Sequence, residues 1–165
     1  MPTFLITVTM VLSMVGGVLA PGASTSGSQV VAPSSLQTAE ITVGGVPLTV
    51  ELAYQPADRA LGLGYREELA AGTGMLFLFE APAPRSFWMR GMQFCIDVVW
   101  IENDVIQGAA ESVCPEPLGT ADVDLASYFS PVPVSYVLEV PAGWLDANGL
   151  GIGTPVEGLP SLQWQ

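Results

Sequence analysis

The feature that most constrains the fold is an alternation of apolar and polar residues that begins near residue 40. Residues 46–52 (VPLTVEL) place valines and leucines on one face of an extended segment and Thr49 and Glu51 on the other. Gly44 and Gly45 separate this segment from a similar one at 41–43, and a diglycine supplies the positive φ angles that tight hairpin turns need. The pattern predicts a β-hairpin at the start of a domain.

Further strands are predicted where short apolar runs follow. These runs are 75–79 (MLFLF), 94–101 (FCIDVVWI), 105–106 and 134–140 (VSYVLEV), and residues 154–156 are expected to return to the sheet. Short helices are expected at 56–61, which begins with proline, and within 141–149. Strands outnumber helices, so the fold class is predicted as mainly β: a compact antiparallel sandwich or barrel-like fold with one or two short helices.

The N-terminal part of the chain has a different character, because the first charged residue is Glu40. Residues 4–20 are uncharged and mostly apolar, and small residues follow them. We therefore predict a signal peptide or N-terminal membrane anchor at 1–22, a flexible Ser/Gly/Pro/Ala-rich tether at 23–39, the domain at 40–158 and a C-terminal tail at 159–165. The expected location is extracytoplasmic, secreted or anchored on the outer face of the cell membrane, with membrane contact only through the N-terminal segment.

Composition excludes several functions. The 165 residues carry sixteen acidic residues against four arginines and a formal net charge of −12, so nucleic acid is not an expected partner. Histidine is absent, which removes the usual ligand of metal sites and the usual base of nucleophilic catalysis. We expect no metal and no cofactor.

The two cysteines, Cys95 and Cys114, have 18 residues between them. A hairpin centred near Asn103 and Asp104 would place them almost opposite each other, allowing for a one-residue bulge. A structural disulfide is the favoured interpretation for an exported domain. A redox role would need a CxxC spacing or a lowered thiol pKa, and the sequence indicates neither.

The positive charges are concentrated in one region. All of them lie within 32 residues, as Arg59, Arg66, Arg85 and Arg90. One interpretation is that they pair with acidic residues at the surface, and the sharper one is a local positive patch suited to an anionic group.

Two carboxylates, Asp97 and Glu139, interrupt apolar strands. A buried carboxylate must be paired, hydrogen-bonded or protonated, and Arg66 or Arg90 could supply the pair. Trp88 stands next but one to Arg90 and could form part of the core or stack a planar ligand. These residues are the candidate ligand-binding or buried ion-pair cluster: Arg66, Trp88, Arg90, Asp97 and Glu139.

Four ordered motifs carry a resemblance to a known family. GLGYREEL (62–69), GMLFLFE (74–80), SFWMRGMQFCIDVVWI (86–101) and YVLEVPAG (136–143) resemble the motifs of the domain of unknown function 192, over about residues 41–157. The resemblance implies a compact, mainly β fold, often behind a signal peptide or anchor, and no established activity. Arg66, Trp88, Asp97 and Glu139 match its polar and aromatic motif positions, whereas Gly64, Arg90, Gly91–Met92 and Cys95 depart from the usual methionine, lysine, Asn-Thr and proline.

The functional hypothesis favoured by these observations is an exported, non-enzymatic accessory or ligand-binding domain, whose partner is an unknown small molecule or an envelope protein. No catalytic residue is assigned. The alternative is a small-molecule hydrolase that uses Asp97 and Glu139 with Arg66. A purely structural envelope module is a third hypothesis. The absence of histidine, of CxxC and of a glycine-rich phosphate loop favours the first.

Overall fold

A computed structural model describes residues 36–160 of the chain. The predicted signal peptide or anchor, most of the tether and most of the tail lie outside these residues. The elements in chain order are β1 (Thr38–Val43), β2 (Val46–Ala53), α1 (Pro56–Leu61), β3 (Thr73–Ala83), β4 (Ser86–Phe87), β5 (Ile96–Glu102), β6 (Val105–Val113), the 3₁₀ turn η1 (Asp122–Asp124), β7 (Tyr128–Phe129), β8 (Val134–Pro141), α2 (Trp144–Asn148) and β9 (Val156–Glu157). The mainly β fold class with two short α-helices is confirmed. So is the first hairpin, where Gly44 and Gly45 have φ angles of 57° and 85°.

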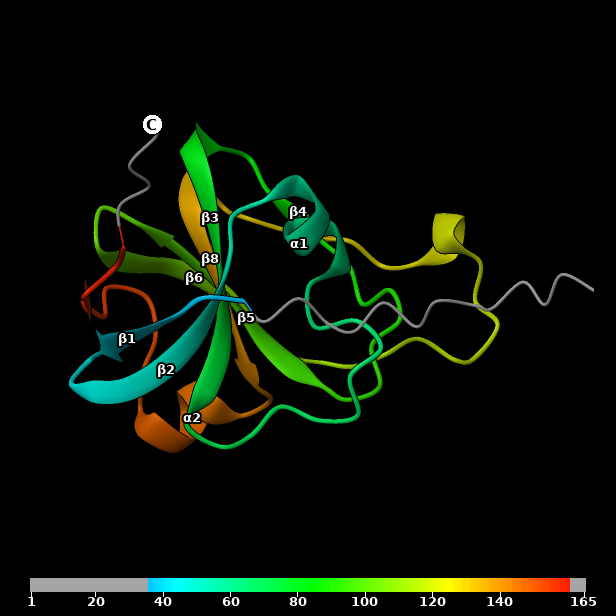
Figure 1. Ribbon diagram of the computed structural model, residues 1–165, viewed down its shortest axis with the longest axis horizontal. Coiled ribbons are helices and arrows are strands. Elements are labelled where there is room, and N and C mark those ends of the chain that lie inside the picture. The colour runs from blue at the N-terminus through cyan, green and yellow to red at the C-terminus, as the bar shows by residue number, and fades with distance from the viewer. Residues whose placement is uncertain (1–35, 161–165) are drawn as a thin grey trace, which may run out of the picture. The chain divides into compact units, whose positions relative to one another are not determined.

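Seven strands form one sheet in the order β6-β5-β8-β3-β2-β1-β9. The sheet curls into a half-barrel (Figure 1). Backbone hydrogen bonds connect the start of β6 to the start of β9: Ile106 N–H of β6 donates to Thr154 O, just before β9, at 2.9 Å, and Val156 N–H of β9 donates to Asp104 O, just before β6, at 2.8 Å. The two outer strands are therefore joined at one end. No helix among the residues described is long and apolar enough to cross a membrane.

One strand pairing departs from the antiparallel expectation. β2 and β3 run parallel, with Thr49 opposite Thr73 and Ala53 opposite Phe77. Parallel neighbours need a crossover connection, and α1 with residues 62–72 supplies it. The remaining pairs of the sheet are antiparallel.

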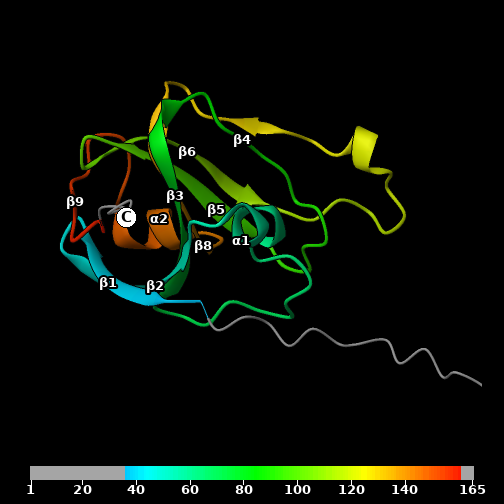
Figure 2. The ribbon, with the colours of Figure 1, turned by 45° about the horizontal axis from the view of Figure 1, so that its top comes forward.

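The sheet separates two hydrophobic clusters, one on each face. The inner cluster lies against α2, whose Leu145 is buried in it, and Figure 2 shows α2 within the curl of the sheet. The outer cluster includes Leu63 and Met89 from the segments around α1 and β4. Alternation decides which cluster a strand residue joins, since successive side chains point to opposite faces. This rule also places the candidate site residues.

A long connection between β6 and β8 carries η1 and projects away from the sheet (Figure 1). Its return strand β7 pairs with β4, as Ser86 opposite Phe129 and Phe87 opposite Tyr128. This small second sheet was not predicted. It holds the β4 segment, with Phe87, over the outer face, where the Phe87 ring contacts Phe77 edge-on at 4.9 Å between centroids.

Candidate functional site

The two strand carboxylates lie on opposite faces of the sheet. β5 and β8 are neighbours in which Asp97 stands opposite Val140, and Glu139 stands opposite Val98. Val140 belongs to the inner cluster and Val98 to the outer one. Asp97 and Glu139 therefore cannot act on one substrate, and the arrangement does not support the hydrolase hypothesis.

Asp97 is fully buried on the inner face and is satisfied by backbone amides. Its Oδ1 accepts hydrogen bonds from the N–H of Ser112 at 2.8 Å and of Gly143 at 3.0 Å, and its Oδ2 accepts one from Leu145 N–H at 3.1 Å. Gly143 and Leu145 belong to the start of α2, so a strand side chain caps that helix. Of the ways to satisfy a buried carboxylate, Asp97 therefore uses hydrogen bonds from three N–H groups, and neither Arg66 nor Arg90 pairs with it.

Arg66 pairs with Glu51 of β2, and not with Asp97 or Glu139. Its two Nη atoms each lie 2.7 Å from an oxygen of Glu51, in a bidentate pair whose side chains are both 32% exposed. The hydrogen bond to Arg66 lowers the pKa of Glu51, and the same bond raises the pKa of Arg66. The prediction that Arg66 could pair with Asp97 or Glu139 is therefore wrong, because the half-buried Glu51 takes both of its Nη atoms.

Arg90 also has an acidic partner, Asp122 of η1, at 3.0 Å. Both side chains are more than half exposed, at 53% and 62%. A pair of this kind contributes little to stability. The Arg90–Asp122 pair connects the segment after β4 to the long β6–β8 connection.

A cavity of about 420 Å³ opens on the outer face of the sheet and contains three of the five predicted residues: Trp88, Arg90 and Glu139. Aromatic side chains Phe77, Phe79 and Phe87 form part of its wall. The segment after α1 completes it, with Leu61, Gly62, Leu63 and Gly64. Arg66 and Asp97 do not line it. The predicted cluster is thus only partly assembled.

Two arginines that the predicted cluster did not include, Arg59 and Arg85, also line this cavity. Both guanidinium groups lie over the ring of Phe79, at 5.0 Å and 3.7 Å from its centroid. Arg59 donates to the backbone carbonyls of Tyr54 and Leu78, and Arg85 donates to those of Ala81 and Val134.

Neither Arg59 nor Arg85 has a carboxylate partner within residues 36–160. Burial, and then the neighbouring charge of Arg59, lower the pKa of Arg85. Two cations therefore repel each other at a cavity. The concentration of arginines in the sequence was a signal for this patch, but the sequence did not show which arginines would lack an acid.

Glu139 is a buried carboxyl group without a satisfying partner. It is 5% exposed, lines the cavity, and its Oε2 atom has no hydrogen-bond partner. Burial raises its pKa from 4.5 to about 8, although the positive charge of Arg66 opposes the shift. At neutral pH the group is therefore mostly a carboxylic acid, which can donate a hydrogen bond.

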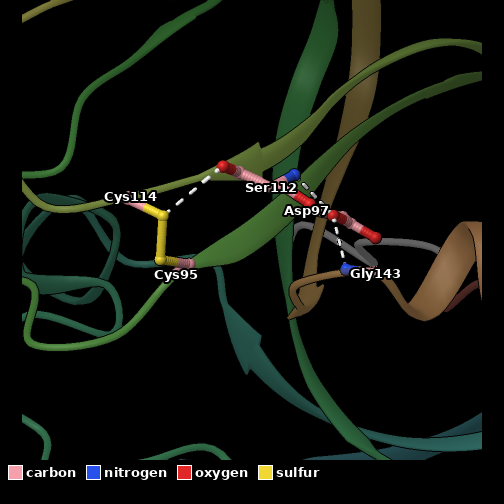
Figure 3. The surroundings of a disulfide bond; sticks show 5 residues. All are labelled: Cys95, Asp97, Ser112, Cys114 and Gly143. Carbon is pink, nitrogen blue, oxygen red and sulfur yellow. Dashed lines mark hydrogen bonds between the residues drawn. A yellow bond between two sulfur atoms is a disulfide. The ribbon is translucent and has the colours of Figure 1, made fainter.

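The cysteines lie on the opposite end of β5 from its turn to β6. Cys95 and Cys114 form a disulfide with their Cα atoms 4.1 Å apart, beside the Asp97 hydrogen bonds (Figure 3). The expected one-residue bulge is present in β6, since Ile96 faces Val113 and Val98 faces Ala110. The described part of the chain contains no group of three or more acidic or cysteine side chains placed to hold a metal.

Comparison with known proteins shows the family of the chain and solved structures that resemble it. A family model, DUF192, described as "Uncharacterized ACR", matches residues 39–158. A crystal structure of a proposed transcription regulator from Sinorhizobium meliloti 1021 is 32% identical with a TM-score of 0.69, and the match covers 77% of this chain and 98% of that one. A protein of unknown function from Novosphingobium aromaticivorans DSM 12444 is 28% identical with a TM-score of 0.65, and the match covers 82% and 99%. No curated protein matches the chain.

Proposed function

The chain belongs to the domain of unknown function 192 family, and we propose that this member is a non-enzymatic, extracytoplasmic domain that binds an anionic small molecule in its outer-face cavity. The observation that carries the proposal is the pair Arg59 and Arg85. Both lie over Phe79 and line the cavity without a carboxylate partner among residues 36–160. An anion between them would relieve their repulsion and accept hydrogen bonds from both.

The abundance of acidic residues makes this arrangement informative. Sixteen acidic residues are available to four arginines. Arg66 and Arg90 each have an acidic partner, while Arg59 and Arg85 have none in the described structure. A surface of net charge −12 would attract cations in general, so a ligand that is anionic must be recognised locally, at the guanidinium groups.

The dimensions and walls of the cavity support a small, partly apolar ligand. A volume of about 420 Å³ falls within the range of small-molecule sites, which are mostly apolar with a few placed polar groups. Phe77, Phe79 and Phe87 provide the apolar wall, and the half-exposed ring of Trp88 stands at its margin. The ligand class that fits is an organic anion with an apolar body.

The extracytoplasmic location is supported by the disulfide between Cys95 and Cys114, because such bonds persist mainly in oxidising compartments. It is also supported by the uncharged apolar run at residues 4–20. A role in transcription, which the description of the Sinorhizobium protein suggests, would need a DNA-binding surface. The net charge of −12 argues against one.

Calorimetric titration of the full chain with undecanoate at pH 6.5 tests the proposal. We expect binding by the wild type, and a loss of at least fivefold in affinity for Arg59→Gln and for Arg85→Gln. Arg66→Gln is the matched control, because this arginine is paired with Glu51 outside the cavity. Thermal melting of each variant shows that it is folded. Equal affinities in the wild type and the two cavity variants would contradict the proposal, and native mass spectrometry of protein from its own host would identify the natural ligand.

A further inference from the structure

The cavity has a second polar group, Glu139, at a position set by the strand register. On the outer face, Glu139 of β8 stands opposite Met75 of β3, and Val137 stands opposite Phe77. Continuing along β3 on the same face, the next residue is Phe79, whose ring both Arg59 and Arg85 contact. Met75 and Phe79 are four residues apart, which is about 13 Å along a strand at about 3.3 Å per residue.

The surroundings of Glu139 leave its carboxyl group available to a ligand. Its strand neighbours on this face, Met75 and Val98, are buried and apolar. The charged groups that face it are the Arg66–Glu51 pair from the far side of β3, and Arg59, Arg85 and Arg90 around the cavity. Arg66 is already held by two hydrogen bonds to Glu51. Glu139 itself retains a buried Oε2 without a partner.

An unsatisfied polar group of this kind costs free energy in the folded protein. An apolar side chain of similar volume would fit between Met75 and Val98 without that cost. A carboxyl group that opens on a cavity and finds no protein partner is therefore explained by a partner that enters the cavity.

We propose that Glu139 is a ligand-contacting residue whose carboxylic acid O–H donates a hydrogen bond to a neutral acceptor oxygen of the bound molecule, at the end opposite its anionic group. This inference rests on the proposed function, since it takes the anion to lie at Arg59 and Arg85. It narrows the ligand to an elongated anion with a carbonyl, ester or ether oxygen on the order of 10 Å from its charge.

The proposal also makes binding depend on pH. The acid form donates the hydrogen bond, whereas the carboxylate form can only accept one and would repel an acceptor oxygen. Because burial raises the pKa of Glu139 to about 8, the donor is present at pH 6.5 and mostly absent at pH 9. The arginines and an alkanoate probe keep their charges across this interval.

The test compares two probes that differ by one carbonyl group, 10-oxoundecanoate and undecanoate, titrated into the full chain at pH 6.5 and pH 9. For the wild type we expect the oxo acid to bind at least fivefold more tightly at pH 6.5, and this preference to disappear at pH 9. Glu139→Gln keeps a neutral donor and should show the preference at both pH values. Glu139→Leu should bind both probes equally at both.

Two further measurements make the test specific. Glu157→Gln is the control, because Glu157 is an exposed strand carboxylate of β9 outside the cavity; it should behave as the wild type. A ¹³C label at the ketone carbon reports the hydrogen bond directly, since its resonance moves downfield in the wild-type complex at pH 6.5 and not in Glu139→Leu.

The outcomes separate this inference from the proposed function. If undecanoate binds through Arg59 and Arg85 but the oxo acid is not preferred, or if Glu139→Leu keeps the preference, the role of Glu139 is refuted and the anion site stands. A preference that Glu139→Gln fails to retain also refutes the donor role. If neither probe binds the wild type, the anion site itself is contradicted.

Discussion

Replacing Asp97 with asparagine is expected to destabilise the domain by about 3 kcal/mol. Oδ1 accepts two backbone N–H groups and Oδ2 accepts the third, from Leu145. In its best orientation an asparagine carbonyl keeps the two bonds to Ser112 and Gly143, but its NH₂ group then faces the Leu145 N–H. One buried donor loses its acceptor, at a cost of about 1–3 kcal/mol, and the two remaining bonds weaken by about 1 kcal/mol each because they are no longer charge-assisted.

Removal of the charge offsets part of this loss, since a buried neutral group has a smaller desolvation cost than a carboxylate. The net value of about 3 kcal/mol corresponds to a fall of roughly 10 °C in melting temperature for a domain of this size. Because α2 begins at these amides, the loss should be accompanied by a weaker start of that helix.

Urea unfolding at pH 7, with the disulfide intact, measures the change. The slope m should be unchanged and the midpoint lower. Asp122→Asn is the matched control: it makes the same chemical change in an exposed pair with Arg90, and should alter stability by less than about 1 kcal/mol. If Asp97→Asn is as stable as the wild type to within 1 kcal/mol, the reasoning that three amides hold this carboxylate is refuted.

Four other predictions follow from the arrangement of charges and covalent bonds. Arg66→Met should lower the free energy of unfolding by about 1 kcal/mol, because its carboxylate partner is partly exposed. In urea unfolding this effect should add to that of Asp97→Asn on the other face of the sheet, and strong coupling between the two substitutions would contradict the prediction. A chain that begins at Ser35 should melt at the temperature of the full chain, as expected if the compact unit starts there. Because the pKa of Glu139 is higher in the folded than in the unfolded protein, the free energy of unfolding of the wild type should fall from about pH 4.5 to about pH 8 and then level off. The fall should be at most about 5 kcal/mol when denaturation is measured at several pH values, and Glu139→Leu should abolish it. Cys95→Ser should lower the free energy of unfolding by about 3 kcal/mol, and a non-reduced digest of the purified wild type should contain the cross-linked peptide pair; free thiols would refute the bond.

Local patterns were sufficient to predict most elements of the sheet. The alternation in residues 46–52 and the diglycine before it specify β2 and its turn through nearest neighbours alone. β4 and β7 were missed because each is two residues long and their pairing joins segments more than 40 residues apart. The parallel β2–β3 pair was missed for a related reason, since only the path of the crossover decides its direction.

The candidate site was harder to predict, because partners across a fold are not visible in sequence neighbours. Glu139 was singled out because it is a carboxyl group in an apolar strand, but burial favours its protonated form, and no arginine pairs with it. Asp97 is also a carboxyl group in an apolar strand, but its oxygens accept hydrogen bonds from backbone amides. Arg59 and Arg85 belonged to a recognised concentration of positive charge, yet only the structure distinguishes them from the two arginines with acidic partners.

The opposite orientation of Asp97 and Glu139 has a consequence for how members of such a fold can diverge. One face of the sheet holds the helix cap and the inner cluster, while the other holds the cavity. Substitutions far apart with no shared partners usually have additive effects, so residues around the cavity can change without disturbing the cap of α2. Residues that line the cavity can therefore be substituted while the stability of the inner face is kept, and two positions on adjacent strands are under separate physical constraints.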